Sequence, residues 1–444
     1  MMKDAVHKAG IHAAIVVALL AGLLAVIVRW YFVTHAQVLQ PLDGDVPWGD
    51  GQQYYRYAWN LVHHHVFSSD IPGTANPKSD GFRDPAYPVL LALGMATTEN
   101  YERWYTVVLL SQALLGGITV VCATLAVRDS MPTWLLAAAG VTMALWPHLV
   151  VLPAYVFSEN LTAPCCAIAA LALSEAARRQ SMPYTVIGGL FMALAALTNA
   201  VLAPIILPLA LALAWKRTMP RCQLLVLAAV VVAPLLAWGI RNSTIQGPFS
   251  SSFRAEVNLV QGSWPTYHLA SQLWAKHDPV GTQTIEAINL EIAALHANRA
   301  RGLRVMAERM SHAPGTYIAW YLGKPALLWG WEIGLGSGDI YAYPTRNSPF
   351  TTNPFMRAVE AVTYIFNGVL GLLALAGLVI IAVRRAPSAA QVTFAITAAW
   401  VTLVYGVLQS DARYSIPYRP GEIALACVAV VAALTWAHRK KGQA

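Results

Sequence analysis

Charged residues are scarce in this sequence of 444 residues: Asp, Glu, Lys and Arg make up only 12% of it, whereas 57% of the residues are hydrophobic. A soluble domain carries about 25% charged residues, because its surface has to face water. A chain of this length with half that charge exposes much of its surface to lipid. We therefore predict an all-α polytopic membrane protein, and a soluble enzyme is excluded.

Cysteines are few as well, and none of the five lies in a long polar loop. This placement argues against a disulfide framework, and no metal-ligand spacing is present. His63, His64 and His65 are adjacent, but consecutive positions on a helix do not share a face, so they do not suit one ion. The sequence therefore indicates no cofactor, and a divalent metal is left open.

The net charge of +8 would suit a nucleic-acid partner if the protein were soluble. Here the basic residues lie between apolar spans rather than in a run interleaved with surface aromatics, so orientation in a membrane explains them more simply. No repeat of about 20–50 residues and no low-complexity linker divides the chain. We therefore exclude nucleic acid as a partner and expect membrane lipids around the protein.

Long apolar runs are present instead, and a run of about 20 residues can cross the hydrocarbon of a bilayer. The first run, 11–28, is longer than the core of a signal peptide, so it is interpreted as an uncleaved transmembrane helix. About ten spans are predicted (range 10 to 12), at 10–32, 104–127, 132–151, 157–174, 184–200, 201–215, 222–240, 356–383, 390–408 and 417–437. The pair at 184–215 is tight and could instead be one hairpin that crosses only partly.

Basic residues of the short loops indicate the orientation of the spans, since such residues accumulate on the cytoplasmic side. If each span crosses once, one side receives Lys3, Lys8, Arg128, Arg178, Arg179, Lys216, Arg217, Arg221, Arg384, Arg385, Arg439, Lys440 and Lys441. Both termini are therefore expected in the cytoplasm of a bacterium, with the protein in the inner membrane. The apolar segment 316–335 is interpreted as a helix at the outer interface, because an extra span there would place Arg384 and Arg385 outside.

The remaining long polar segments, 33–103 and 241–355, then face the outside. We expect three parts in the chain. The first is an N-terminal transmembrane module at 1–240 that includes the first outer loop. An outer segment with interfacial helices follows at 241–355, and the C-terminal transmembrane helices occupy 356–444.

The first outer loop contains three aspartates, Asp43, Asp45 and Asp50. From Tyr54 onward, apolar residues recur at helical spacing, which predicts an amphipathic helix on the membrane surface with Asp50 near its N-terminus. The helix dipole favours an ionised carboxylate there, and such a carboxylate at the membrane boundary can act as a general base. From these residues alone, the simpler interpretation is that Asp50 caps the helix in a solvated loop.

This loop resembles the first outer loop of the GT-C glycosyltransferases, through Asp50, the helix after it and the stretch 83–88 (RDPAYP). It is similar in particular to family 39, the bacterial relatives of the dolichyl-phosphate-mannose protein mannosyltransferases and of the lipid A aminoarabinose transferase. Such enzymes take a sugar from a polyprenyl-phosphate carrier. The resemblance implies a GT-C fold, matches Asp50 to the family's catalytic base and makes Asp45 a candidate second acid or acceptor contact.

Three later motifs occur in the order that the family shows. They are Phe157-Ser158-Glu159 at the start of the fourth helix; Trp238, Arg241 and Asn242, with Gly247, Asn258, Leu259 and Gly262 in a following strand-like loop; and Asp411, Arg413, Tyr414, Pro417 and Pro420 late in the chain. By its position, Glu159 is a candidate for acceptor binding or for a second acid. Where relatives often carry an arginine, this chain has Asn199, so the contact of that arginine is not carried over.

Arginines fit the implied chemistry, because the donor's phosphate sits at the outer interface while its lipid tail stays in the bilayer. Arg83, Arg241 and Arg413 lie at predicted outer helix ends or in adjoining loops, where they can stabilise a phosphate leaving group. Tyr414 is expected to add a hydrogen bond to the donor phosphate. The alternative for each arginine is that it snorkels to lipid headgroups.

We therefore hypothesise an inverting glycosyltransferase that moves a hexose or pentose from a polyprenyl-phosphate donor at the outer face of the inner membrane. The acceptor is left open among lipid, glycan and protein. The main alternative is a lipid or small-molecule transporter or flippase, but transporters usually place ionisable residues near the bilayer midplane, whereas the predicted spans are almost free of charge. A non-catalytic assembly subunit is a further alternative.

Overall fold

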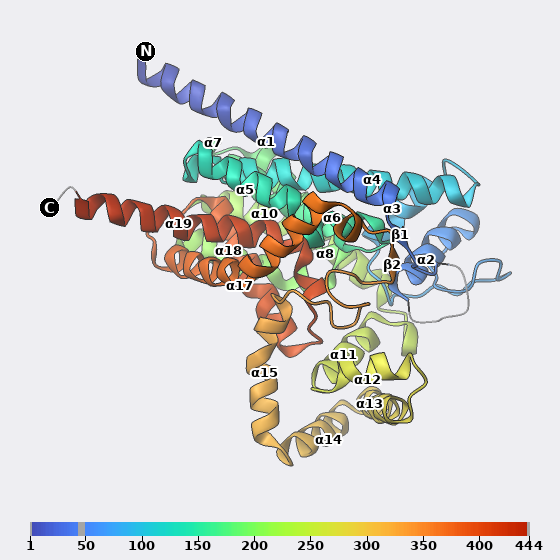
Figure 1. The fold of residues 1–444 in the computed structure, drawn as a ribbon. Coiled ribbons are helices and arrows are strands. Elements are labelled where there is room, and N and C mark those ends of the chain that lie inside the picture. The colour runs from blue at the N-terminus through green and yellow to red at the C-terminus, as the bar shows by residue number, and fades with distance from the viewer. Residues whose placement is uncertain (1, 43–48, 442–444) are drawn as a thin grey trace.

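The computed structural model describes residues 2–42 and 49–441, which are helical almost throughout (Figure 1). The α-helices are α1 (Met2–His35), α2 (Asp50–His64), α3 (Ala86–Met95), α4 (Tyr101–Ala126), α5 (Thr133–Leu145), α6 (Pro147–Val151), α7 (Glu159–Arg179), α8 (Met182–Thr198), α9 (Ile206–Trp215), α10 (Arg221–Asn242), α11 (Ser251–Gly262), α12 (Tyr267–Trp274), α13 (Pro279–Ala297), α14 (Arg299–Ser311), α15 (Pro314–Leu328), α16 (Pro349–Thr352), α17 (Pro354–Val383), α18 (Ala389–Val407) and α19 (Arg419–Lys441). The 3₁₀ helices are η1 (Arg128–Ser130), η2 (Leu152–Ala154), η3 (Ala200–Ile205), η4 (Gly247–Phe249) and η5 (Ala412–Tyr418). The predicted all-α fold class is confirmed.

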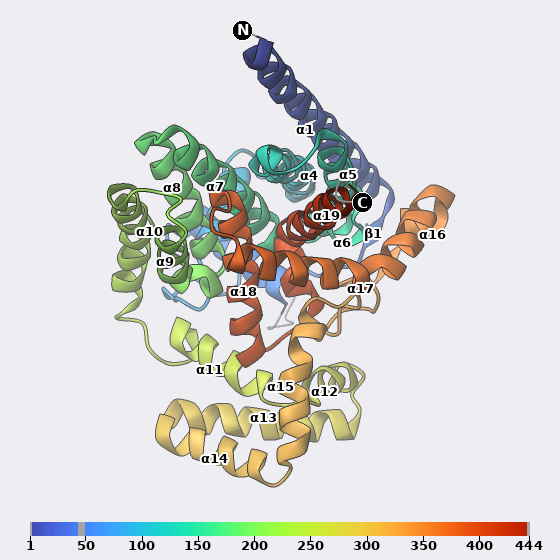
Figure 2. The same ribbon diagram turned by 90° about the vertical axis from the view of Figure 1, so that its left-hand side faces the viewer.

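The long helices form one bundle, in which α1 begins and α19 ends at the same end (Figures 1 and 2). In the described parts of the chain, seven helical segments are long and apolar enough to cross a membrane. They are α1, α4, α7, α10, α17, α18 and the continuous stretch of η5 with α19. Each of these segments coincides with a predicted span, so the protein is a multi-pass membrane protein.

The other three predicted spans are interrupted or short. The span at 132–151 is a pair of helical segments bent by 53°, and the bend lies at Trp146, immediately before Pro147. Proline has no N–H to continue a helix and forces the preceding residue towards an extended conformation. The spans at 184–200 and 201–215 correspond to α8, of 17 residues, and to η3 followed by α9, of 10 residues.

Arg29 of α1 stabilises the bend after α5. Its guanidinium is buried and donates to the backbone oxygens of Ala144 at 2.9 Å and of Met143 at 3.3 Å. These carbonyls lie in the last turn of α5, where the break leaves them without partners from the helix itself. Because hydrocarbon offers no replacement hydrogen bonds, the arginine makes the bend compatible with the membrane interior.

Two glycines bring α1 and α4 into close contact. A Cβ at Gly22 would lie 2.3 Å from Cγ2 of Val121, and one at Gly117 would lie 2.3 Å from Cγ2 of Val26. Helices in a bilayer associate through close packing at small residues, since lipid removes the hydrophobic drive between them. The glycines therefore fix the position of α1, and with it the point where the first outer loop begins.

The first outer loop lies at the other end of the bundle, where α2 and α3 are found (Figure 1). The strands β1 (Gln37–Val38) and β2 (Thr345–Arg346) pair antiparallel there, with Gln37 opposite Arg346. This short sheet joins the chain that leaves α1 to the segment that precedes α16. It thereby holds the start of the loop against a part of the chain that is distant in sequence.

Helices α11 to α15 form a layer beside this end of the bundle (Figures 1 and 2). Three of them, α11, α13 and α14, share a small apolar core of Val260, Ile288, Ile292, Leu295 and Met306. Helix α15 runs across the direction of the bundle helices in both views and is not among the helices that could span a membrane. The helix predicted at 316–335 thus corresponds to α15, which ends at Leu328, and its position at the outer interface stays a prediction.

The strand-like loop expected after Arg241 and Asn242 is wrong, because its residues 251–262 form the helix α11. Ser250 caps this helix, and its Oγ accepts a hydrogen bond from the backbone N–H of Phe253 at 3.1 Å. A serine in this position satisfies one of the free N–H groups of the first turn. The resemblance thus matched the residues of this segment but did not predict its conformation.

Candidate functional site

Asp50, the first residue of α2, lies between two arginines from distant parts of the chain. Its Oδ1 accepts a hydrogen bond from Nη2 of Arg83 at 2.5 Å, and its Oδ2 accepts one from Nη2 of Arg413 at 2.6 Å. The N-cap residue before Asp50 is Gly49, which has no side chain to accept a hydrogen bond from the first turn. The helix dipole and the two guanidiniums together favour a negative charge at this point.

Arg83 is positioned by the same helix. Its Nε donates to Oε1 of Gln53 at 2.5 Å, and its guanidinium lies 5.2 Å from the centre of the Tyr54 ring. Gln53 and Tyr54 follow Asp50 by three and four residues, so one face of α2 provides all of these contacts. The chain between α2 and α3 therefore returns to the N-terminus of α2.

A buried amide on α4 connects α3 to the segment before α7. Oε1 of Gln112 accepts from the hydroxyl of Tyr87 at 2.5 Å. Its Nε2 donates to the backbone oxygens of Pro153 at 2.9 Å and of Tyr155 at 3.1 Å. Since Tyr87 follows Arg83 and Tyr155 precedes Glu159, Gln112 fixes the two sides of the site relative to each other.

Arg413 lies at the start of η5 and joins the last motif to the fourth predicted helix. Oδ1 of Asp411 accepts from the backbone N–H of Arg413 at 2.8 Å, and its Oδ2 accepts from that of Leu335 at 2.9 Å. The Arg413 guanidinium lies 3.7 Å from the centre of the Phe157 ring, and its Nε donates to Oε1 of Glu159 at 2.8 Å. Backbone, ring and carboxylate thus hold this side chain in one orientation.

The four side chains form a row of alternating charge, in the order Arg83, Asp50, Arg413 and Glu159. Asp50 is 26% exposed and Glu159 is 6% exposed. Burial opposes ionisation of Asp50, but the two guanidiniums outweigh it and hold the pKa of Asp50 well below its usual range. The carboxylate is therefore ionised at neutral pH, and it is a weak base as long as both arginines bind it.

Tyr414 lies beside Arg413 and stacks on Tyr405, with 5.0 Å between the ring centres. Nδ2 of Asn199 lies 3.2 Å from the hydroxyl of Tyr405, to which it donates. Asn199 is the position where relatives often carry an arginine, and its hydrogen bond to Tyr405 connects it to Arg413 through two tyrosines. The structure therefore brings together Asp50, Arg83, Glu159, Arg413 and Tyr414.

Arg241 is not brought into this group. Its guanidinium donates to the backbone oxygen of Asp80 and to the hydroxyl of Ser79, and it lies 4.8 Å from the centre of the Trp238 ring. These contacts hold the first outer loop against the end of α10. A role of Arg241 in phosphate binding stays a prediction, and Asp45 lies outside the described residues.

In residues 2–42 and 49–441, no group of three or more His, Cys, Asp or Glu side chains is arranged to hold a metal ion. Of the three adjacent histidines, His63 stacks on Trp59, with 4.1 Å between the ring centres. Its Nδ1 lies 2.9 Å from the backbone oxygen of the same tryptophan.

Solved structures with a similar fold include two of archaeal oligosaccharyltransferases. The apo oligosaccharyltransferase of Archaeoglobus fulgidus matches with a TM-score of 0.50 and 15% identity, over 97% of this chain and 51% of that chain. AglB from the same organism, in complex with an inhibitory peptide and a dolichol-phosphate, matches with a TM-score of 0.50 and 17% identity, over the same shares. ArnT from Cupriavidus metallidurans, bound to undecaprenyl phosphate, matches with a TM-score of 0.38 and 14% identity, over 93% of this chain and 77% of that chain.

No family model and no curated protein sequence matches the chain. At these identities, the likeness shows the fold alone, which the chain shares with the oligosaccharyltransferases over nearly its whole length. The fold implied by the resemblance of the first outer loop is thereby confirmed. The chain spans about half the length of these archaeal structures.

Proposed function

We propose that this protein is an inverting glycosyltransferase that moves a hexose or pentose from a polyprenyl-phosphate carrier to a lipid, glycan or protein acceptor. The observation that carries the proposal is the position of Asp50 between Arg83 and Arg413. The likeness of the fold to AglB in complex with a dolichol-phosphate supports it. We assign the site to the outer face of a bacterial inner membrane, with both termini in the cytoplasm.

The donor phosphate binds at the arginines in this proposal. A sugar linked to polyprenyl phosphate carries one negative charge on its phosphodiester, and the polyprenyl phosphate that leaves gains a second. Because negative charge grows on the phosphate as the sugar departs, Arg83 and Arg413 stabilise the transition state more than the bound donor. Tyr414, beside Arg413, adds a hydrogen bond to the same phosphate.

Asp50 acts as the general base. The acceptor hydroxyl attacks the anomeric carbon, its proton passes to Asp50, and the carbon–oxygen bond to the phosphate breaks with its electron pair going to the phosphate oxygen. A single displacement inverts the configuration at the anomeric carbon. The phosphate competes with Asp50 for the guanidiniums, so donor binding raises the pKa of Asp50 towards its ordinary value and makes it a stronger base.

Glu159 has a supporting part in this scheme. Its Oε1 accepts from Nε of Arg413, whereas Asp50 is bound by Nη2 of the same guanidinium. A phosphate can therefore take the Nη2 edge while Glu159 keeps hold of Nε. We assign Glu159 to the orientation of Arg413 rather than to the second acid that its position in the motif implies.

Sugar transfer by the purified protein in nanodiscs tests the proposal. The donors are polyprenyl phosphates that carry radiolabelled hexoses and pentoses, and the acceptors are membrane lipid extract, glycans and peptides. Asp50→Asn and Arg413→Gln are compared with Arg304→Gln, which replaces an exposed arginine of α14. We expect transfer that depends on the carrier, a loss of at least about 100-fold in both site variants, and no change in the control.

The alternative function is examined with the same preparation. A fluorescent lipid-linked sugar is placed in one leaflet of proteoliposomes, and its movement to the other leaflet is followed. Passage of the intact lipid without sugar transfer would favour the transporter or flippase instead. Full transfer activity in Asp50→Asn would remove Asp50 as the base.

A further inference from the structure

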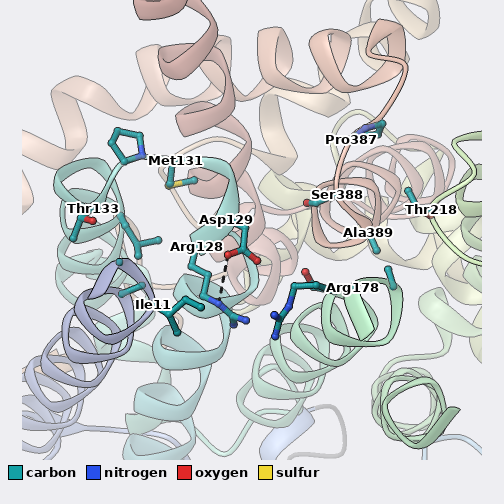
Figure 3. A pocket seen from close by; sticks show the side chains of 16 residues that line it. Ile11, Arg128, Asp129, Met131, Thr133, Arg178, Thr218, Pro387, Ser388 and Ala389 are labelled. Carbon is teal, nitrogen blue, oxygen red and sulfur yellow. Dashed lines mark ion pairs between the residues drawn. The ribbon is translucent and has the colours of Figure 1, made fainter. Parts of the chain in front are cut away.

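A cavity lies between the start of α1 and the end of α7 (Figure 3). These helix ends lie at the end of the bundle opposite to α2, whose first residue is Asp50 (Figure 1). Its volume is about 670 Å³, which is in the range of pockets that hold small molecules. Its walls come from the start of α1, the turn between α4 and α5, the end of α7, the turn between α9 and α10, and the turn between α17 and α18. Asp50 follows the far end of α1, so this cavity does not belong to the site described above.

Two arginines line the cavity and share one carboxylate. Arg128, after α4, and Arg178, in the last turn of α7, both donate to Glu175. In the part of the chain that the structure describes, Nε of Arg128 is buried without a hydrogen-bond acceptor, and the carboxylate of Asp129 lies 3.8 Å from it (Figure 3). Buried donors are almost always paired in folded proteins, so the geometry suits a further acceptor at this point.

Positive charge predominates around the cavity. Two of its lining residues, Thr218 and Pro387, belong to short turns whose charged residues are all basic. Arg128 and Arg178 line the cavity, and Lys216, Arg217, Arg221, Arg384 and Arg385 lie within three residues of Thr218 or Pro387 in the sequence. In the turns that line the cavity and at the end of α7, the only acidic residues are Asp129 and Glu175. The cavity therefore favours an anion.

The start of α5 adds to this preference. Thr133, its first residue, lines the cavity, and no side chain caps this helix of 13 residues. The N–H groups of an uncapped first turn attract negative charge. A different wall is apolar, where Ile11 and Ala14 of α1 lie with Leu136 of α5. A basic side and an apolar side in one cavity match a molecule with a charged head and a hydrocarbon tail.

We propose that this cavity binds the phosphate headgroup of an anionic phospholipid from the leaflet on that side of the membrane. Arg128 and Arg178 hold the phosphate, and the wall formed by Ile11, Ala14 and Leu136 contacts the first part of the acyl chains. Basic pockets between transmembrane helices on the cytoplasmic side recognise such headgroups. A free phosphate ion would use the basic side and leave the apolar wall without a function. The bound lipid joins α1 and α5 to α7 and α18.

Native mass spectrometry of the delipidated full chain in neutral detergent tests this assignment. The protein is titrated with phosphatidylglycerol, with phosphatidylcholine of the same acyl chains, and with inorganic phosphate as a competitor. Arg178→Gln removes a cation that lines the cavity. Arg179→Gln is its matched control, because Arg179 also binds Glu175 but is outside the lining. Thr133→Trp fills the cavity from an exposed position.

We expect phosphatidylglycerol to bind at least about tenfold more tightly than phosphatidylcholine, since one charge-assisted contact is enough for a factor of that size. Arg178→Gln weakens this binding about tenfold, Thr133→Trp abolishes it, and Arg179→Gln leaves it unchanged. Both arginines are substantially exposed, at 40% and 53% of the side chain, so the variants retain the fold, as thermal unfolding verifies.

Three results would overturn the proposal. The first is equal binding of the two phospholipids. The second is an equal loss in Arg178→Gln and Arg179→Gln, because it would indicate a general effect of surface charge. The third is displacement of phosphatidylglycerol by inorganic phosphate at equal concentration, since the site would then recognise the anion and make no use of the apolar wall.

Discussion

The ion pair between Asp50 and Arg83 allows a test of the proposed site that needs no substrate. Nη2 of Arg83 lies 2.5 Å from Oδ1 of Asp50, and the two side chains are 13% and 26% exposed. Two unit charges about 4 Å apart attract each other by about 4 kcal/mol at an effective dielectric constant of about 20. Desolvation of both groups and the water that reaches Asp50 offset part of this attraction, so a net coupling of about 2 kcal/mol is expected.

A double-mutant cycle measures this coupling. The free energy of unfolding is determined by SDS titration in mixed micelles for the wild type, Asp50→Asn, Arg83→Gln and the double variant. Asp50→Asn alone leaves Arg83 and Arg413 facing each other without the carboxylate between them, so it destabilises the fold. The second substitution removes one of the two facing cations, so the double variant is more stable than the sum of the single effects by about 2 kcal/mol.

The control is Arg103→Gln, an exposed arginine of α4, whose effect should add to that of Asp50→Asn. If Asp50→Asn and Arg83→Gln add to within about 0.5 kcal/mol, the two side chains are not paired in the folded protein. The proposed arrangement of base and phosphate site would then be wrong, whatever the variants do to activity.

The coupling also has a defined pH dependence. The folded protein holds the pKa of Asp50 well below its usual value of about 3.9. A carboxyl group with a lowered pKa stabilises the fold above its unfolded pKa and loses this contribution as the pH falls through its folded pKa. The coupling found at pH 7 should therefore be unchanged at pH 5, and its disappearance by pH 5 would contradict the assignment of two arginine partners.

Two further substitutions test the supports of the site, with the same SDS titration. Gln112→Leu leaves the hydroxyl of Tyr87 without its acceptor and should lower the free energy of unfolding by about 2–3 kcal/mol, whereas Ser111→Ala, at an exposed position next to it, should change it by less than about 0.5 kcal/mol. Gly117→Leu should separate α1 from α4 and lower the unfolding temperature, whereas Gly239→Ala should not, because nothing lies within 4 Å of a Cβ at that position. Equal effects of the two glycine substitutions would refute the close contact of α1 with α4.

Most of the bundle follows from hydrophobic length, because a helix in lipid has to satisfy its own backbone and needs about 20 apolar residues to cross. The predicted spans differ from the helices where a run is interrupted. Pro147 was visible in the sequence, but an apolar run that contains a proline is predicted as one span, because the sequence does not show how far the helix bends there. The same holds for 184–215, where α8 ends at Thr198 and a 3₁₀ turn follows.

The site was predictable only in part. Asp50 and Arg413 are 363 residues apart, and no periodicity relates them, so the sequence did not predict that their side chains meet. Gln53 could have been found, since it lies three residues after Asp50 on the same helix face. The hydrogen bond between Gln112 and Tyr87 could not have been predicted, because no sequence pattern identifies the partner of a buried amide. Arg241, in contrast, was found through its motif, but its hydrogen bonds are to Asp80 and Ser79 of the first outer loop.

The row of alternating charges predicts that Asp50 opposes donor binding before it assists the reaction. The two guanidiniums that would bind the phosphate are occupied by Asp50, so a donor has to displace this carboxylate from at least one of them. Asp50→Asn removes the competing charge. The variant should therefore bind a polyprenyl-phosphate sugar at least as tightly as the wild type, while its turnover falls by about 100-fold or more.

Linkage gives this prediction a pH dependence as well. Because donor binding raises the pKa of Asp50 towards its ordinary value of about 3.9, donor affinity of the wild type should be unchanged from pH 7 to pH 5. Affinity should increase, and turnover should decrease, only as the pH falls from about 5 towards about 4 and the base becomes protonated. The phosphodiester of the donor does not titrate in this interval, so the change belongs to the protein. Binding is measured with a fluorescent donor by anisotropy, and turnover with radiolabelled sugar. If Asp50→Asn weakened binding and turnover alike, Asp50 would hold the arginines in place for the donor, and the competition between carboxylate and phosphate would be refuted.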